Sequence, residues 1–245
     1  MALGALVVVL IAVAGWVVVE VVSWPDVAAL ARTNPKTTSF IERYQAQRRA
    51  AGQSDRVEWR WVPGEAISPH LKRAAVSAED MEFFSHDGFS TAEIKVALRE
   101  AFAEREAPRG ASTITQQLAK NLWLSPSRSP LRKLRELILT RQLERSLTKR
   151  RMLEIYLNVV EFGPGVYGAE AAAQRYFGKP AVFLTEHEAA QLAASLPRPS
   201  RWHPGVESSA YWGYVEDIED RMARATFLWR HVGGAPAVPE VTDSL

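Results

Sequence analysis

Apolar residues recur at helical spacing along most of the chain, after one uninterrupted apolar run near its start. Residues 152–159 show the three- and four-residue spacing that gathers side chains on one face of a helix. Residues 57–62, Val-Glu-Trp-Arg-Trp-Val, alternate apolar and polar instead, which predicts one short strand. There is no internal repeat, no regular alternation of strands with helices and no glycine-rich phosphate loop. The pattern predicts a mainly α-helical domain over residues 37–233.

Helix-start signals agree with this prediction. Two serine–proline pairs place an N-cap before a proline at the first helical position, at Ser68-Pro69 and Ser129-Pro130. Three segments fit the capping box, in which two side chains satisfy free backbone N–H groups: Ser90-x-x-Glu93, Thr113-x-x-Gln116 and Thr185-x-x-Glu188. Three spaced glycines break one helix and open the next: Gly163, Gly165 and Gly168.

The apolar run at residues 2–19 is long enough for a membrane span, because eighteen helical residues cover roughly 27 Å. We predict an anchor over residues 1–23, a juxtamembrane linker over 24–36 and a flexible tail over 234–245. A cleaved signal peptide is the alternative, with Ala12-Val13-Ala14 as its small-residue site, but the charged leading segment of such peptides is missing. Basic residues follow the run, which by the positive-inside rule would place the domain in the cytoplasm.

Composition changes this picture little. The 245 residues are 47% apolar and 24% charged, as expected of a folded domain. The formal net charge of +2 gives no support to a nucleic-acid partner. Cysteine is absent, which excludes disulfides, thiolate chemistry and cysteine–zinc sites. A zinc-protease helix is also excluded, since the segment at His187-Glu188 lacks the second histidine.

Within residues 77–88, three carboxylates precede two phenylalanines, with a histidine and a glycine after them: Glu79, Asp80, Glu82, Phe83, Phe84, His86 and Gly88. Apolar surroundings raise the pKa of a carboxyl group and suit it to proton transfer. The plainer interpretation is a helix end whose acids face water while Phe83 and Phe84 fill the core.

Residues 109–121 are dense in hydroxyl and amide side chains at a helix start, where free backbone N–H groups favour an anion. A capped helix with a polar face would explain one hydroxyl and one glutamine, but not the whole set. Residues 128–151 form a basic helical stretch, in which Glu136 lies one turn from Arg132 and Lys133. This stretch is either a solvated face with weak ion pairs or a cationic wall for phosphate groups or lipid heads.

Taken together, these blocks resemble the peptidoglycan glycosyltransferase family, specifically its monofunctional biosynthetic transglycosylases. The resemblance covers about residues 68–204. It rests on Glu79-Asp80-x-x-Phe83-x-x-His86-x-Gly88, Gly110-x-Ser112-Thr113-Ile114-Thr115-Gln116-Gln117-x-x-Lys120-Asn121, Arg132-Lys133-x-x-Glu136, Leu153-Glu154-x-Tyr156-Leu157-Asn158, Tyr176-Phe177-x-Lys179 and Leu184-Thr185-x-x-Glu188-Ala189-Ala190-x-Leu192-Ala193. Ala111 stands where many members have a second glycine, and Trp202-His203 replaces a common Tyr-Asn.

The resemblance implies a lysozyme-like, mainly helical domain with one N-terminal transmembrane helix. It implies a single-pass protein of the inner membrane with its catalytic domain on the outer, periplasmic face, which opposes the orientation taken from charge. The implied reaction joins the disaccharide-peptide units of lipid II into glycan strands and releases undecaprenyl diphosphate. The implied partners are lipid II, the growing glycan strand, the membrane and other cell-wall synthesis or division proteins, with no nucleic acid.

The resemblance also implies two catalytic carboxylates, Glu79 as the base and Glu136 as the group that orients cations or a bound divalent ion. The residues it implies for substrate binding are Phe83, His86, Ser112, Thr115, Gln116, Gln117, Lys120, Asn121, Arg128, Arg132, Lys133 and Asn158. It requires no cofactor, and Mg²⁺ or Mn²⁺ at Glu136 is the one metal role left open. Residues 89–102 are either a helix that dips into the bilayer or a plain core helix.

Two alternatives remain at this point. A lytic enzyme that cleaves glycan strands would also use one glutamate on a lysozyme-like fold. An inactive membrane-anchored scaffold in cell-wall assembly would be expected to have lost a catalytic carboxylate, whereas both Glu79 and Glu136 are present.

Overall fold

The structure, a computed structural model, describes residues 15, 22, 24–89, 112–127 and 129–234. Its α-helices are α2 (Ser39–Ala50), α3 (Pro69–Glu79), α5 (Ile114–Trp123), α6 (Pro130–Ser146), α7 (Lys149–Val159), α8 (Ala169–Phe177), α9 (Glu186–Ser195), α10 (Ser209–Arg224) and α11 (Trp229–Val232). The short 3-10 helices are η1 (Ala28–Ala31), η2 (Gly64–Ala66), η3 (Ala181–Phe183) and η4 (Thr226–Leu228). The strands are β1 (Glu58–Trp59), β2 (Glu161–Gly163) and β3 (Val166–Tyr167). The predicted mainly α-helical class is confirmed.

The helices begin where the sequence signals predict. The hydroxyl groups of Ser68 and Ser129 accept backbone N–H groups at the starts of α3 and α6, each with proline in the first turn. Both side chains of the capping box are engaged at the starts of α5 and α9. The third predicted box, Ser90-x-x-Glu93, lies outside the described residues.

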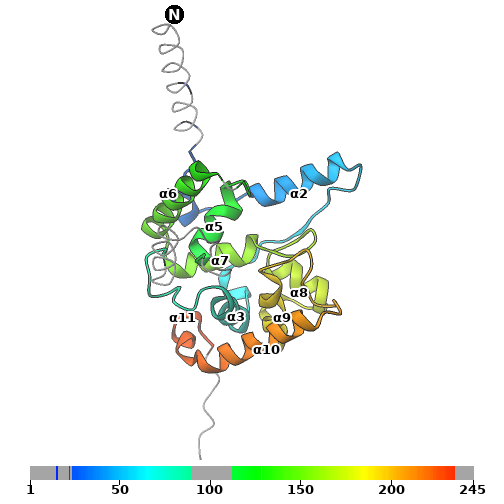
Figure 1. Cartoon of the computed structure of the whole chain (residues 1–245). Coiled ribbons are helices and arrows are strands. Elements are labelled where there is room, and N and C mark those ends of the chain that lie inside the picture. Colours follow the sequence, from blue (N-terminus) through cyan, green and yellow to red (C-terminus); the bar gives the residue numbers. More distant parts are fainter. Residues whose placement is uncertain (1–14, 16–21, 23, 90–111, 128, 235–245) are drawn as a thin grey trace, which may run out of the picture.

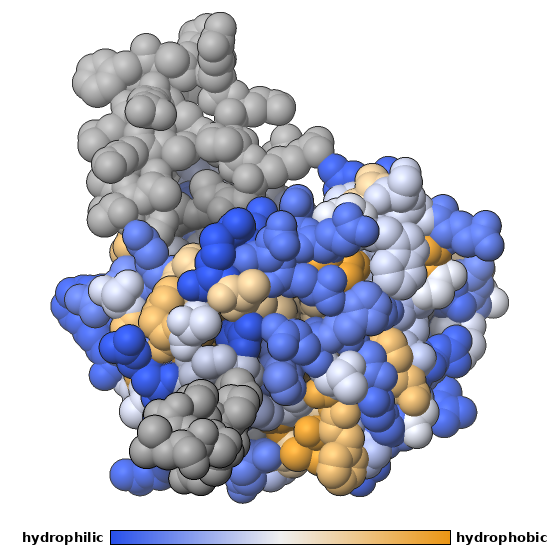
Figure 2. All heavy atoms as spheres, turned by 90° about the horizontal axis from the view of Figure 1, so that it is seen from below, coloured by the Kyte–Doolittle hydropathy of each residue, from blue (hydrophilic) through white to orange (hydrophobic). Residues whose placement is uncertain are grey.

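Two groups of helices build the domain. α3 packs against α9 and α10, and α5 packs against α6 and α7. In Figure 1 the first group occupies the lower part of the molecule and the second the upper part. The fully buried aromatic side chains include Phe83, Tyr156, Phe162, Tyr167 and Tyr211, so the core extends through both groups. The face seen from below is largely hydrophilic, with apolar residues in separate patches (Figure 2).

A small three-stranded sheet, in the order β1-β3-β2, lies beside α8. β1 is parallel to β3, whereas β2 and β3 form an antiparallel pair. The strand predicted over residues 57–62 is confirmed at its centre. The glycines predicted only to separate two helices build this β2–β3 hairpin, and Gly168 follows it with φ +81°. A Cβ on Gly168 would lie 2.6 Å from the carbonyl oxygen of Asn158, so glycine is required there.

The predicted membrane span at residues 1–23 lies outside the described residues, apart from Gly15 and Val22. Within the described ranges, no helix has both the length and the apolar character needed to cross a bilayer. The predicted linker at residues 24–36 packs onto the domain, because η1 lies there and Val27 and Leu30 are buried in the core. The predicted helix at 89–102 falls outside the described residues beyond Phe89, and the predicted tail does so beyond Gly234.

Candidate active site

Glu79 is the last residue of α3, and its carboxylate faces the start of α5. Its Oε2 atom accepts a hydrogen bond from Nε2 of Gln117 at 2.6 Å. Burial raises the pKa of the Glu79 carboxyl group, while the Gln117 hydrogen bond and the positive charge of Lys120 oppose that rise. Burial therefore acts on the pKa of this carboxyl group in the direction that its sequence context suggested.

Tyr156 fixes which end of the Gln117 amide meets Glu79. Its hydroxyl group, on α7, donates to Oε1 of Gln117 at 3.0 Å, which turns Nε2 toward the carboxylate. Nε2 of Gln117 also reaches the carbonyl oxygen of Ser112 at 3.4 Å. Burial raises the pKa of Tyr156 well above its ordinary value, so the hydroxyl group keeps its proton and acts as a donor. The sequence placed Tyr156 in a motif without assigning it this role.

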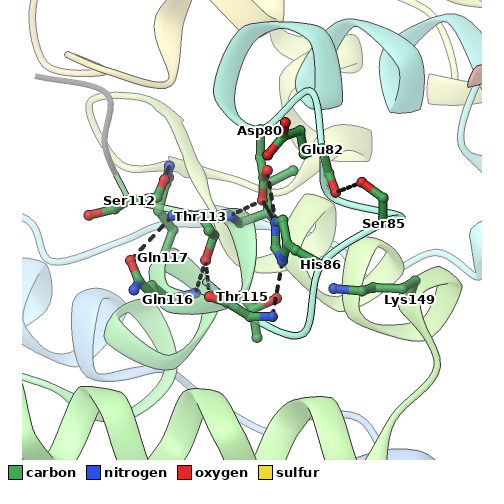
Figure 3. Close-up of polar contacts among 12 residues, drawn as sticks. Asp80, Glu82, Ser85, His86, Ser112, Thr113, Thr115, Gln116, Gln117 and Lys149 are labelled. Carbon is green, nitrogen blue, oxygen red and sulfur yellow. Dashed lines mark hydrogen bonds and ion pairs between the residues drawn. The ribbon is translucent and has the colours of Figure 1, made fainter. Parts of the chain in front are cut away.

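Asp80 braces the turn that follows Glu79 (Figure 3). Both of its carboxylate oxygens lie 3.0 Å from Nε2 of His86, and Oδ2 accepts the backbone N–H of Ile114 at 3.0 Å. Nδ1 of His86 accepts the backbone N–H of Gly88, so Nε2 carries the ring proton and donates it to Asp80. The hydroxyl group of Thr113 donates to the carbonyl oxygen of Gly88 at 2.8 Å. The start of α5 and the turn after α3 are therefore joined by one network.

Lys120 lies one helical turn after Gln117 on α5, between the two predicted catalytic carboxylates. Burial lowers the pKa of its ammonium group, and the negative charges of Glu136 and Glu79 act against that fall. The positive charges of Arg132 and Lys133 lower the pKa further. The charge of Lys120 thus interacts with the charges of both carboxylates.

Glu136 lies on α6 with its side chain almost fully buried. Nη1 of Arg132 donates to Oε2 of Glu136, and Nζ of Lys133 donates to Oε1 at 2.6 Å. The Arg132 side chain is largely buried, whereas half of the Lys133 side chain faces solvent. Arg132 and Lys133 thus both pair with Glu136, and their positive charges act on Lys120. Arg128, predicted to join them, lies outside the described residues.

Several residues predicted to bind substrate are engaged with protein groups in this structure. Gln116 closes the capping box of α5, and Asn121 donates to the carbonyl oxygen of Gln117 at 2.8 Å. The hydroxyl group of Thr115 is buried and donates to Glu144 at 2.6 Å. Both amide atoms of Asn158 hydrogen-bond to the backbone of Val62. Their predicted substrate contacts stay predictions, and each side chain also serves the fold.

Phe83, His86 and Ser112 were also predicted to bind substrate, and their surroundings differ from one another. Phe83 is fully buried, with the Lys149 ammonium group 4.6 Å from its ring centroid. Both ring nitrogens of His86 hydrogen-bond to protein, whereas the side chain of Ser112 lies half-buried at the start of α5. The substrate contacts predicted for these three residues likewise stay predictions.

Two charged residues of this region, Arg221 and Glu144, carried no signal in the sequence. Arg221 on α10 contributes a positive charge that opposes the rise in the pKa of Glu79, and its Nη1 atom lies 3.5 Å from the carbonyl oxygen of Ala78. Glu144 on α6 accepts from Thr115 and, at 2.7 Å, from Nζ of Lys149. Arg221 lies 143 residues from Ala78 and Glu144 lies 29 residues from Thr115, so no local spacing indicates these two contacts.

The sequence left a metal ion at Glu136 as an open possibility. Within the described part of the chain, no three acidic or histidine side chains come together in a way that could hold a metal ion. Each oxygen of Glu136 accepts from a cationic side chain. A role for Mg²⁺ or Mn²⁺ stays a prediction.

Comparison with known proteins gives a consistent result. Residues 44–224 match the family described as "Transglycosylase". A protein of Thiobacillus denitrificans named "Biosynthetic peptidoglycan transglycosylase" is 42% identical over 91% of this chain and 89% of its own length. Proteins with the same name from an Azoarcus species and from Aromatoleum aromaticum are 46% and 45% identical, over 86% and 79% of this chain and 88% and 84% of theirs.

Proposed function

Since the chain belongs to the transglycosylase family and is a glycosyltransferase of peptidoglycan synthesis, we propose that it polymerises lipid II into β-1,4-linked glycan strands with release of undecaprenyl diphosphate. The observation that carries this proposal is that a buried carboxyl group, that of Glu79, lies in the field of several cationic side chains. Burial raises the pKa of the Glu79 carboxyl group, which interacts with the charge of Lys120, and the charges of Arg132 and Lys133 act on Lys120 in turn. Such a site suits a reaction with a hydroxyl nucleophile and a diphosphate leaving group.

Glu79 is the proposed base. The 4-hydroxyl oxygen of the acceptor sugar attacks the anomeric carbon of the donor, and its proton passes to the Glu79 carboxylate. A carboxyl group with a raised pKa accepts this proton more readily than an ordinary glutamate does. The Gln117 amide, held by Tyr156, orients the carboxylate for the transfer. A single displacement of this kind inverts the α-linked donor to a β-1,4 bond.

The cations serve the leaving group. The bond between the anomeric carbon and the diphosphate oxygen breaks, and its electron pair stays on the diphosphate. Lys120 and Arg132 compensate the charge that develops there, and Glu136 holds Arg132 and Lys133 in position. The leaving group therefore requires cations rather than a general acid.

Cleavage of existing glycan strands is the second candidate, because one buried glutamate could also serve a lytic enzyme. Its leaving group would be a sugar hydroxyl, which needs a proton more than positive charge. The grouping of Lys120, Arg132 and Lys133 near Glu79 favours the diphosphate substrate over this alternative.

The test supplies purified lipid II to the wild type and to Glu79→Gln, and measures glycan strands and undecaprenyl diphosphate. We expect both products from the wild type and almost none from the variant. Product from neither protein would overturn the polymerase proposal, and equal product from both would overturn the role of Glu79. Preformed strands are incubated in parallel, and their shortening by the wild type would support the lytic alternative.

We also propose that residues 1–23 anchor the chain in the inner membrane with the domain on the outer face. The support is the apolar run at residues 2–19 and the surface next to it. Trp24 and the exposed Leu131 and Leu134 of α6 line a groove of 450 Å³ near the start of the domain. Protease added outside spheroplasts should digest the domain, and protection until lysis would contradict this orientation.

A further inference from the structure

The segment after α10 contacts the helix that carries Glu79, although it lies beyond the residues matched by the family model. The family match ends at residue 224, whereas η4 and α11 occupy Thr226–Leu228 and Trp229–Val232. α11 packs against α3, at whose C-terminal end Glu79 lies. Figure 1 places α11 beside α3 at the lower end of the molecule.

One contact holds the turn directly after Glu79. The rings of Phe84 and His231 stack in parallel, with their centroids 4.4 Å apart and an angle of 10° between the planes. Phe84 also meets the edge of the buried Phe83 at 5.1 Å, and Phe83 meets the edge of His86 at 6.4 Å. His86 in turn donates to Asp80, the neighbour of Glu79. A continuous series of contacts therefore runs from α11 to the residue next to the proposed base.

A second contact holds α3 itself. The Arg73 guanidinium group lies 4.2 Å from the ring centroid of Trp229, and His70 meets the same ring edge-on at 5.3 Å. Arg73 is buried and bonded by Nη2 to Glu186 on α9 at 2.7 Å and to the carbonyl oxygen of Met222 on α10 at 2.9 Å. Trp229 thus packs against α3 at Arg73, which lies less than two helical turns before Glu79.

A third contact joins α11 to α7. Nε of Arg150 donates to the carbonyl oxygen of His231 at 3.1 Å. α7 is the helix that carries Tyr156, which orients Gln117 against Glu79. α11 therefore touches α3 and α7, two of the helices that position the carboxylate, as well as the turn that follows α3.

Phe84 has room to move if the stack is lost. A cavity of 330 Å³ lies between η2, α3, α7 and α11, and both Phe84 and His231 line it. Truncating His231 would enlarge this cavity and let the Phe84 ring swing into it, which would loosen the turn at residues 80–88.

We propose that α11 positions Glu79 for catalysis and that His231, acting through Phe84, is a positioning residue of this enzyme. His231 acts on the site only through the turn, so it affects the geometry of the base rather than contact with substrate. A displacement of about 1 Å in a reacting group can lower a rate by up to about 100-fold. The inference rests on the proposed role of Glu79 as base.

The experiment compares His231→Ala, His231→Phe and the matched control His187→Ala in the full chain. His187 lies on α9, stacks on Trp212 at 6.5 Å and pairs with Glu219, so its removal also deletes a histidine stack on the surface. We expect His231→Ala to lower kcat about tenfold with KM within about twofold, His231→Phe to restore kcat, and His187→Ala to leave both unchanged. Phe84→Ala combined with His231→Ala should lower kcat no further than either change alone.

Hydrogen exchange provides a readout that does not depend on activity. Amides of residues 80–88 should exchange faster in His231→Ala than in His187→Ala or the wild type. Faster exchange without any loss of kcat, equal losses in both alanine variants, or no rescue by phenylalanine would each overturn the positioning role. Full activity of Glu79→Gln would instead overturn the base assignment, and the exchange result would still report whether α11 holds the turn.

Discussion

Glu79 and Glu136 are the two carboxylates proposed to act together, but their surroundings differ in the charge they provide. Glu79 is met by a neutral amide, and burial raises its pKa. Glu136 is almost fully buried and accepts from two cationic side chains. Lys120 lies between them and interacts with both charges. The same functional group therefore has surroundings that suit proton uptake in one place and cation pairing in the other.

The difference shows how a fold can assign two roles to one residue type. A base must lose its charge during the reaction, so it benefits from a site that compensates that charge only in part. A carboxylate that orders cations keeps its charge throughout and benefits from full pairing. Mutations should therefore separate the two residues by their effects on activity and on stability.

The largest effect is expected from Glu79→Gln, which keeps the shape of the side chain but cannot accept a proton. We expect kcat to fall by about 100- to 10,000-fold, the range typical of a lost general base. Glu82→Gln is the matched control, because Glu82 belongs to the same turn and its side chain is exposed. Initial rates of glycan formation check this prediction. A comparable loss of kcat in Glu82→Gln would show that the effect is not specific to Glu79.

The same variant should not lower stability at neutral pH. Burial raises the pKa of Glu79 in the folded state, so the folded state binds more protons than the unfolded state at pH values between the two pKa values. Stability therefore falls as pH rises through that window, and the ionised carboxylate costs free energy at neutral pH. Thermal unfolding of Glu79→Gln should begin no lower than that of the wild type at pH 7, and the two should converge at acidic pH.

The next effect concerns Glu136→Gln, which leaves the charges of Arg132 and Lys133 without their partner. We expect the free energy of unfolding to fall by about 1–3 kcal/mol, because the Arg132 side chain is largely buried. Adding Lys133→Gln should recover part of this loss by removing one uncompensated charge. Denaturant unfolding measures both. A larger loss of kcat in Glu136→Gln than in Glu79→Gln would reverse the proposed roles.

A third, smaller effect is a shift in pH dependence in Gln117→Leu. The Gln117 hydrogen bond favours the ionised form of Glu79, so its loss raises the pKa of that carboxyl group further. A base works only when it is deprotonated, and the acidic limb of kcat/KM should therefore move to higher pH. A limb that stays in place would mean that Glu79 does not determine it.

The sequence predicted those parts of the site that depend on neighbours along the chain. Thr113 and Gln116 were recognisable as a capping box, and Glu136 as one turn from its two cations, because helical spacing determines these contacts. The pairing of Glu79 with Gln117 spans 38 residues, and that of Gln117 with Tyr156 spans 39. No local pattern specifies such contacts, which depend on how α3, α5 and α7 pack.

Contacts between distant segments also explain why some residues have structural roles that the sequence did not predict. Asn158 lies in a motif of the family, yet its amide group ties α7 to the segment around Val62, 96 residues away. The β2–β3 hairpin follows from glycines that the apolar pattern marked only as breaks, because strands of two and three residues are too short to show an alternation.

The smallest effect is expected from Tyr156→Phe, which removes only the hydroxyl group that orients Gln117. Stability should fall by about 1 kcal/mol for the lost buried hydrogen bond, and kcat should fall by about two- to fivefold because the amide can turn its oxygen toward Glu79. Tyr211→Phe is the matched control, since Tyr211 is also fully buried and donates to the carbonyl oxygen of Gln191 at 3.0 Å. It should lose similar stability without any change in kcat. If both variants lost the same fraction of kcat, the effect of Tyr156→Phe would be one of stability alone. The orientation of the Gln117 amide would then no longer distinguish the surroundings of Glu79 from those of Glu136.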